Sequence, residues 1–276
     1  AGIAVLRMDD RGVGGSTGRL GRSTLEDLAG DANAAARLLR RRPEIDPARV
    51  GLLGQSQGGL VAILAAQGSD SVAFVVLLAS PGVSGVELMV RQTEMLAAAA
   101  GDGPADIRRK AKSQEGIMKL VAAGADSAAL HAELRKALRA EAMATGEGRL
   151  PADADLEARI RSELRTLRSP IYVSLVASDP RPALKELRTP VLALGGDLDQ
   201  QVDPQQNLPE IRRALELAGN EDVTTHSFPG LNHLFQRAQT GGVEAYGRIE
   251  QTMDPAVLKK VREWIRARFG RPGVAR

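Results

Sequence analysis

A serine lies among glycines at residues 54–59, where the sequence reads Gly-Gln-Ser-Gln-Gly-Gly. This Gly-x-Ser-x-Gly pattern follows the apolar run 50–53 and precedes an alanine-rich stretch that favours a helix. A sharp turn from a buried strand into a helix lifts the serine hydroxyl above the sheet edge, and glycines two residues away on either side let strand and helix approach closely. The backbone N–H of Gln57 would lie at the helix N-terminus, where it can stabilise an oxyanion. The pattern predicts Ser56 as a nucleophile and Gln57 as its oxyanion-hole residue; the alternative is a glycine-rich turn without chemistry.

A serine hydroxyl needs a base, and the chain offers three histidines. His131 lies among alanines and charged residues in a helical region, so we expect it on a solvated face. His226 lies inside the predicted strand 223–228, where an ordinary strand histidine is expected. His233 follows that strand in a loop, and loops at the carboxyl ends of parallel strands are where the sites of open α/β sheets gather. This position favours His233 as the base over a loop histidine that only packs.

The base in turn needs a carboxylate that orients the imidazole and stabilises its positive charge. The strand predicted over residues 190–194 continues into Gly-Gly-Asp-Leu-Asp, which places Asp197 and Asp199 at the same sheet edge. Asp203 follows a few residues later. The pattern alone leaves the three aspartates open.

These side chains depend on a sheet to bring them together, and apolar runs predict one. Continuous rather than alternating apolarity is typical of parallel strands that are buried on both faces. Helical periodicity between the runs indicates an α/β fold, a mostly parallel sheet flanked by helices. Strands are predicted at residues 3–8, 50–54, 74–79, 190–194 and 223–228, and helices at 23–42, 59–66, 205–217 and 254–269.

The pattern changes between the third and fourth of these strands, where strand-like runs nearly vanish and helical periodicity dominates. This stretch is too long for a simple connection. We therefore predict a core formed by residues 1–85 and 189–276, with a helical cap at 86–188 inserted between two strands; a separate helical domain is the alternative. The cap would form one wall of a substrate pocket. Methionines at 89, 95 and 118 could line it, although packing between helices is the better-supported interpretation.

Composition excludes several classes of function. The net charge is +3, the basic residues are scattered and only 3% of residues are aromatic, which argues against nucleic-acid binding. The absence of cysteine excludes disulfides, thiolate metal sites and a cysteine nucleophile. No apolar run approaches the roughly 20 residues that span a bilayer, and no His, Asp and Glu cluster has ligand spacing. We expect a soluble protein without metal or cofactor, cytoplasmic or, if a signal peptide precedes residue 1, secreted; the oligomeric state stays open.

Taken together, the motifs resemble those of bacterial α/β-hydrolases of the esterase and acyl-hydrolase type. Residues 54–59 resemble the nucleophile elbow of these enzymes, and residues 229–235, Pro-Gly-Leu-Asn-His-Leu-Phe, resemble their histidine loop. Residues 196–202 resemble the family's Gly-x-x-Asp-x-x-Val, which places the acid on Asp199. Two further segments, 9–16 and 179–194, resemble the turn after the fourth strand and the passage from cap to acid strand.

The resemblance implies the α/β-hydrolase fold and a serine hydrolase that cleaves carboxylic esters through an acyl-enzyme. Its catalytic triad would be Ser56, Asp199 and His233, in the chain order of this family. The partner would be a small-molecule ester or acyl substrate. A serine peptidase, a thioesterase or an acyltransferase would use the same site. A non-catalytic binding module would be favoured by a broken triad, whereas a dehalogenase-like use of the fold requires an aspartate in place of Ser56.

The chain enters its first predicted strand within a few residues of Ala1. Members of the resembled family carry further strands before that one, and the loop after their third strand supplies a second oxyanion N–H. We therefore expect the sequence to be truncated at its N-terminus and assign only the Gln57 amide. Asp9, Arg11 and Ser16 are expected to brace a buried turn rather than to contact substrate.

Overall fold

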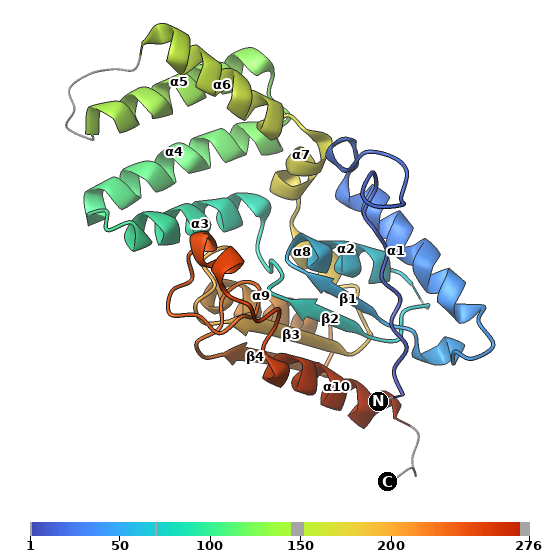
Figure 1. Ribbon diagram of the computed structural model, residues 1–276. Helices are drawn as coiled ribbons and strands as arrows, with labels where there is room; N and C mark the ends of the chain where they lie inside the picture. Colours follow the sequence, from blue (N-terminus) through green and yellow to red (C-terminus); the bar gives the residue numbers. More distant parts are fainter. Residues whose placement is uncertain (1, 70, 145–151, 271–276) are drawn as a thin grey trace. The chain divides into compact units, whose positions relative to one another are not determined.

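The computed structural model describes residues 2–69, 71–144 and 152–270 (Figure 1). The chain divides into two compact units, one of residues 1–8, 26–83 and 180–276 and the other of residues 9–25 and 84–179. The first contains the sheet and the second is helical. Each is described by itself below.

The sheet has four parallel strands in the order β1-β2-β3-β4. They are β1 (Leu52–Gln55), β2 (Val75–Leu78), β3 (Val191–Gly196) and β4 (Val223–Phe228). The two central strands, β2 and β3, are buried along their whole length, as their continuous apolarity predicts. Because the strands are parallel, their carboxyl ends meet at one edge of the sheet.

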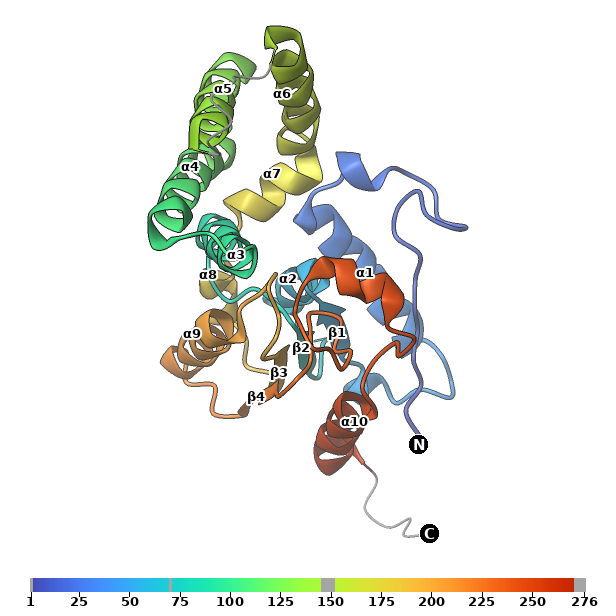
Figure 2. The same cartoon turned by 60° about the vertical axis from the view of Figure 1, so that its left-hand side comes forward.

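Helices cover both faces of this sheet (Figures 1 and 2). On one face, α2 (Gln57–Ala66), α8 (Pro180–Leu184) and α9 (Pro204–Leu217) contribute Ile63, Leu184 and Ile211 to a buried cluster with alternate residues of β2 and β3. On the other face, α10 (Pro255–Phe269) packs Val257 and Trp264 against the remaining residues of those strands. Helix α1 (Leu25–Arg40) and the short 3-10 helices η2 (Pro47–Arg49) and η3 (Val243–Arg248) complete the unit, which confirms the predicted fold class.

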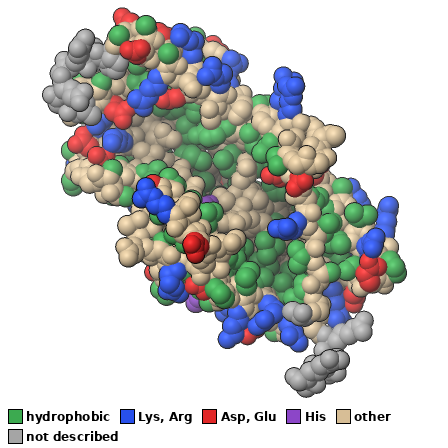
Figure 3. Space-filling model, in the orientation of Figure 1, with side chains coloured by type: hydrophobic (Ala, Val, Ile, Leu, Met, Phe, Trp, Pro, Cys, Tyr) green, Lys and Arg blue, Asp and Glu red, His purple; other side chains and the backbone are tan. Residues whose placement is uncertain are grey.

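The strand predicted at residues 3–8 is absent, so that prediction was wrong. No residue of this segment pairs with a strand, and Val5 and Met8 are 79% and 52% exposed. A strand exists only through hydrogen bonds to a neighbour, and within the described residues β1 pairs with β2 alone. Leu53 of β1 is accordingly 56% exposed. Figure 3 shows hydrophobic side chains on the surface of this unit. Lys and Arg side chains are spread over the whole face that the figure draws.

The helical unit consists mainly of a segment inserted between β2 and β3, as predicted. Its helices are α3 (Gly85–Ala99), α4 (Pro104–Ala122), α5 (Ser127–Ala144), α6 (Asp153–Leu167) and α7 (Pro170–Ala177). Met118, Leu130, Leu134 and Ile160 are almost completely buried in its core.

The helical unit differs from the predicted cap in its limits. Residues 9–25, with the 3-10 helix η1 (Leu20–Arg22), belong to it, because η1 packs against α7 and the Leu25 N–H donates to Ser174 Oγ at 3.1 Å. The turn that these residues form is exposed rather than buried: Asp9 Oδ2 accepts from the Gly15 N–H, and Ser16 Oγ donates to the Asp9 carbonyl at 2.8 Å. Among the described residues, no helix combines the length and apolarity needed to cross a membrane.

Candidate active site

Ser56 occupies a strained turn between β1 and α2. Its φ of 54° and ψ of −123° lie where L-residues are rarely found, which costs of order 1–3 kcal/mol. Its N–H donates to the Leu78 carbonyl at 2.8 Å, which fixes the turn against the end of β2. The hydroxyl makes no hydrogen bond that caps α2. The Ser56 side chain therefore lies at the carboxyl edge of the sheet, and its hydroxyl is not used to cap the helix.

The glycines around Ser56 differ in whether a side chain could replace their hydrogen without a collision. A Cβ on Gly54 would collide with the carbonyl of Gly58, and a Cβ on Gly59 would collide with the side chain of Ser80. A Cβ on Gly58 would meet nothing within 4 Å. The expectation that both glycines two residues from Ser56 are needed for close approach therefore holds for Gly54 and was wrong for Gly58, whose place is taken by Gly59.

His233 and Asp199 form a buried pair. Nδ1 of His233 lies 2.8 Å from Oδ2 of Asp199, and the two residues are 5% and 0% exposed. The other carboxylate oxygen, Oδ1, accepts from the N–H groups of Gln201 and Val202 at 2.8 and 2.9 Å. A carboxylate can only accept, so the proton of this hydrogen bond lies on Nδ1, and in a neutral imidazole Nε2 then bears the lone pair that can act as a base.

The structure separates the three aspartates that the pattern left open. Asp197 Oδ1 accepts from the Gly230 N–H at 2.6 Å and so ties the end of β3 to the loop after β4. Asp203 caps α9, with Oδ1 accepting from the Gln205 N–H at 2.9 Å. Asp199 is the aspartate that contacts His233.

Ser56 and His233 are linked through Gln55, the last residue of β1. Gln55 Nε2 donates to the His233 carbonyl at 3.1 Å, which holds the histidine loop beside the turn of Ser56. A hydrogen bond between the Ser56 hydroxyl and the imidazole is not among those that the described residues form. Gln57 is the first residue of α2, so its N–H has no carbonyl partner within the helix.

The family model described as "Alpha/beta hydrolase family" matches residues 1–245. The chain belongs to the alpha/beta hydrolase family. Among solved structures, it resembles the alpha/beta hydrolase GrgF from Penicillium sp. sh18, with a TM-score of 0.50 at 16% identity over 94% of this chain and 78% of that one. The esterase RhEst1 from Rhodococcus sp. ECU1013 gives a TM-score of 0.44 at 23% identity over 92% of this chain and 77% of that one. The monoacylglycerol lipase of Paleococcus ferrophilus gives 0.48 at 17% identity over 91% and 79%.

A curated relative matches only locally. An uncharacterized protein of Mycobacterium tuberculosis (strain ATCC 25618 / H37Rv) is 42% identical over 62 residues, which are 22% of this chain and 21% of that protein. The match thus spans about a fifth of the relative's length.

In this alpha/beta hydrolase, the histidine loop is shaped by residues that sequence reasoning missed. Asn232 is completely buried; its Oδ1 accepts from the N–H groups of Leu234 and Gln236 at 3.0 and 2.9 Å. Phe235 is also completely buried, with a φ of 58°. Asn232 stands directly before the histidine, which was the one available signal, but an Asn in a loop has many ordinary roles.

Tyr246 is a second residue that the sequence did not single out. Its hydroxyl accepts from Gln201 Nε2 at 2.9 Å, while the backbone N–H of the same glutamine donates to Asp199. Burial raises the pKa of Tyr246, and the Asp199 charge raises it further, whereas the hydrogen bond from Gln201 lowers it. Gln201 therefore connects η3 to the carboxylate beside His233.

The other two histidines lie elsewhere. His226 is in β4, as predicted, with its ring edge-on to Phe228 at 4.5 Å. His131 is not simply solvated: its Nε2 lies 2.7 Å from Oε2 of Glu157, and the pair is only about a third exposed. This contact joins α5, which carries His131, to α6, which carries Glu157. Among the described residues, no three His, Asp or Glu side chains are grouped to hold a metal ion.

Proposed function

We propose that this alpha/beta hydrolase is a serine hydrolase that cleaves carboxylic esters with Ser56, His233 and Asp199. His233 Nε2 takes the proton of the Ser56 hydroxyl as Oγ attacks the ester carbonyl carbon. The Gln57 N–H stabilises the resulting oxyanion. The tetrahedral intermediate then collapses, the alcohol leaves with the proton from His233, and water activated by the same imidazole hydrolyses the acyl-enzyme.

The observation that carries this proposal is the buried Asp199–His233 pair. With Oδ1 held by two backbone N–H groups and Oδ2 by the imidazole, the carboxylate has a single orientation. A fixed, ionised carboxylate keeps the proton on Nδ1 and stabilises the imidazolium that forms during the reaction. If the Asp199–His233 pair only packed, a nucleophile in a strained turn beside it would not be expected. Ser56 is held in such a turn.

The fold by itself does not identify the substrate. An ester is proposed ahead of a peptide because an alcohol is a better leaving group than an amine and therefore demands less of a serine nucleophile. Thioester hydrolysis, peptide cleavage and acyl transfer would use the same three side chains. Turnover of short-chain p-nitrophenyl esters, acyl thioesters and aminoacyl anilides distinguishes them.

Covalent labelling tests the nucleophile. A fluorophosphonate probe should modify the chain once, at Ser56, and the Ser56→Ala variant should not react. Failure of the probe to label Ser56 in a folded sample would support a non-catalytic binding module instead.

A matched pair of aspartate variants tests the acid. Asp199→Asn should lower kcat by roughly 10⁴-fold, because the amide favours the wrong imidazole tautomer. Asp197→Asn, two residues away, keeps an oxygen that can accept from the Gly230 N–H and touches no contact of the imidazole, so it should keep most of the activity. Equal losses in both variants would contradict the assignment of Asp199.

A further inference from the structure

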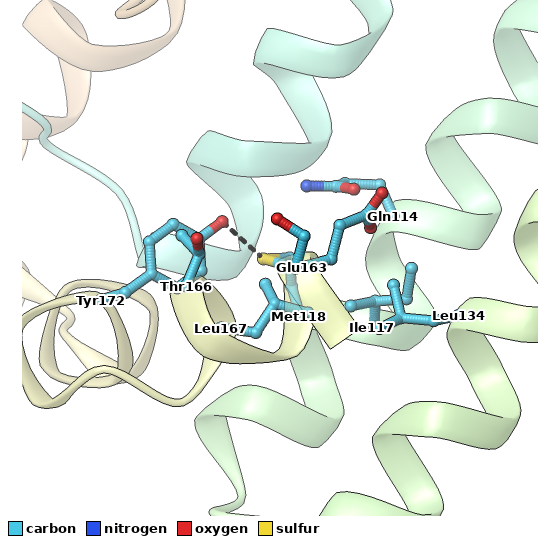
Figure 4. A pocket seen from close by; sticks show the side chains of 9 residues that line it. Gln114, Ile117, Met118, Leu134, Glu163, Thr166, Leu167 and Tyr172 are labelled. Carbon is cyan, nitrogen blue, oxygen red and sulfur yellow. Dashed lines mark hydrogen bonds between the residues drawn. The ribbon is translucent and has the colours of Figure 1, made fainter. Parts of the chain in front are cut away.

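The helical unit contains a hollow of about 290 Å³ among α4, α5, α6 and α7 (Figure 4). Its floor is apolar, formed by Ile117, Met118 and Leu134, which are almost completely buried. Its mouth lies at the exposed residues Ser162 and Thr166 of α6. All of the lining residues belong to this one unit.

A second hollow of about 360 Å³ adjoins the first along α4 and extends toward α3. The two share Gln114, Ile117, Leu134 and Glu163, and we refer to them together as the cleft. Small-molecule sites typically measure some 300–1,000 Å³ and combine an apolar lining with a few polar groups. The second hollow falls within this size range and the first lies just below it, and both combine apolar side chains with polar and charged ones.

Tyr172 is a polar group of the cleft whose hydroxyl donates only to weak acceptors. Its hydroxyl reaches Met118 Sδ at 3.6 Å and Met89 Sδ at 4.0 Å, and thioether sulfur is a weak acceptor. In Figure 4 the hydroxyl points from α7 toward Met118, over the cavity floor. Burial raises the pKa of Tyr172, and the charge of Glu163 raises it further, so the phenol keeps its proton and remains a donor.

The charges around the cleft are already compensated. Arg159 pairs with Glu163 at 3.1 Å, Arg109 with Asp106 at 2.8 Å, and Lys110 with Asp102 at 2.5 Å. A carboxylate or phosphate on the ligand would have to displace one of these partners. The side-chain amide of Gln114, in contrast, makes no hydrogen bond to any residue that the structure describes. The polar groups that remain suit an uncharged ligand.

We propose that this cleft binds an uncharged aliphatic molecule with one oxygen-bearing end, such as a ketone or an alcohol. The oxygen accepts from Tyr172 Oη in place of the methionine sulfurs, and the chain lies on the apolar floor. This site is built from the helical unit alone and does not depend on the proposed esterase activity.

Methionine methyl NMR tests the proposal directly. Labelling with [methyl-¹³C]methionine places reporters at Met118 in the cleft and at Met253 in the sheet-containing unit. Titration with 2-nonanone should shift the Met118 signal saturably and leave Met253 unchanged. Nonanoate, of the same length but charged, should bind at least tenfold more weakly.

Two variants locate the ligand within the cleft. Tyr172→Phe keeps the ring but removes the donor, and should weaken 2-nonanone binding roughly five- to tenfold, since a hydrogen bond is worth about 1 kcal/mol net. Thr166→Trp places a large ring at the mouth and should abolish binding, whereas Arg161→Trp, on an exposed position of the same helix that does not line the cleft, should not.

The proposal is overturned if 2-nonanone leaves Met118 unshifted, if nonanoate binds as tightly, or if Tyr172→Phe binds with unchanged affinity. Thermal melting establishes that each variant is folded. If Thr166→Trp does not fold, the Tyr172→Phe titration and the comparison with nonanoate still decide the matter.

Discussion

Gln55 is the last residue of strand β1, and its side chain links the turn of the proposed nucleophile to the loop of the proposed base. Its Nε2 donates to the His233 carbonyl at 3.1 Å. Losing this bond frees the histidine loop to move relative to Ser56, although the Asp199 contact remains. A loop that must be repositioned before each turnover slows the chemical step more than it weakens substrate binding.

We therefore expect Gln55→Leu to lower kcat on a p-nitrophenyl ester roughly three- to tenfold while KM changes little, in line with one lost hydrogen bond. Steady-state kinetics measure this. Gln67→Leu is the matched control, because Gln67 makes a comparable bond to Glu186 at the far end of α2. A fall in kcat of the same size in Gln67→Leu, or none in Gln55→Leu, would refute a positioning role.

At this scale, the sequence identifies residue types better than partners. Ser56 and His233 stand out because their motif and loop position limit the choices. The proposed acid does not stand out in this way, because Asp197, Asp199 and Asp203 share one loop. Only the coordinates show which of them contacts the imidazole. Family resemblance had selected Asp199. The roles of Asn232 and Gln55 were not predicted, because a side-chain amide that bonds to the backbone leaves no periodicity in the sequence.

At the scale of elements, the turn from β1 into α2 requires a residue without a side chain at Gly54. Gly54→Ala should lower the free energy of unfolding by about 2 kcal/mol or more, because its Cβ would strike the Gly58 carbonyl, which cannot move aside. Gly58→Ala should be neutral or stabilising by up to about 1 kcal/mol, because the space is open and alanine favours a helix. Urea denaturation measures both. Similar losses in the two variants would mean that the close approach lies elsewhere.

The pairing of α5 with α6 should depend on pH. The hydrogen bond from His131 lowers the pKa of Glu157, and Arg135 adds to the effect. A carboxyl whose pKa is lower in the folded state contributes stability above its unfolded pKa and loses it as the pH falls through the folded value. Glu157→Gln should thus reduce the melting temperature at pH 7 and have little effect near pH 3.

Glu133→Gln serves as the comparison for that variant. Glu133 also lies on α5 but pairs with Lys136 of the same helix, so its loss should barely change melting at either pH. A Glu157→Gln effect that persists undiminished at pH 3 would show that packing, rather than charge, joins the two helices.

For the whole molecule, the sequence predicted β1 to β4 in their order but added a strand at residues 3–8 that the structure lacks. The division into units was predicted only in part. Continuous apolar runs identified β2 and β3 because central parallel strands must be buried on both faces. The helical insertion was visible as a change of periodicity. Residues 9–25 were assigned to the core, however, and they pack with the helical unit through the contact of Leu25 with Ser174. Such contacts join residues far apart in the sequence, so local patterns do not reveal them.

Hydrogen exchange across the chain tests this organisation. The slowest amides should be those of β2 and β3, because both strands are buried and have hydrogen-bonded neighbours on either side. Residues 3–8 should exchange within seconds, since the segment is exposed and pairs with no described strand, despite its strand-like sequence. Mass spectrometry of peptic peptides resolves these segments. Strong protection of residues 3–8 would show that they form a strand in solution after all, and the exposed edge of β1, where Leu53 faces solvent, is the neighbour that they would then have to use.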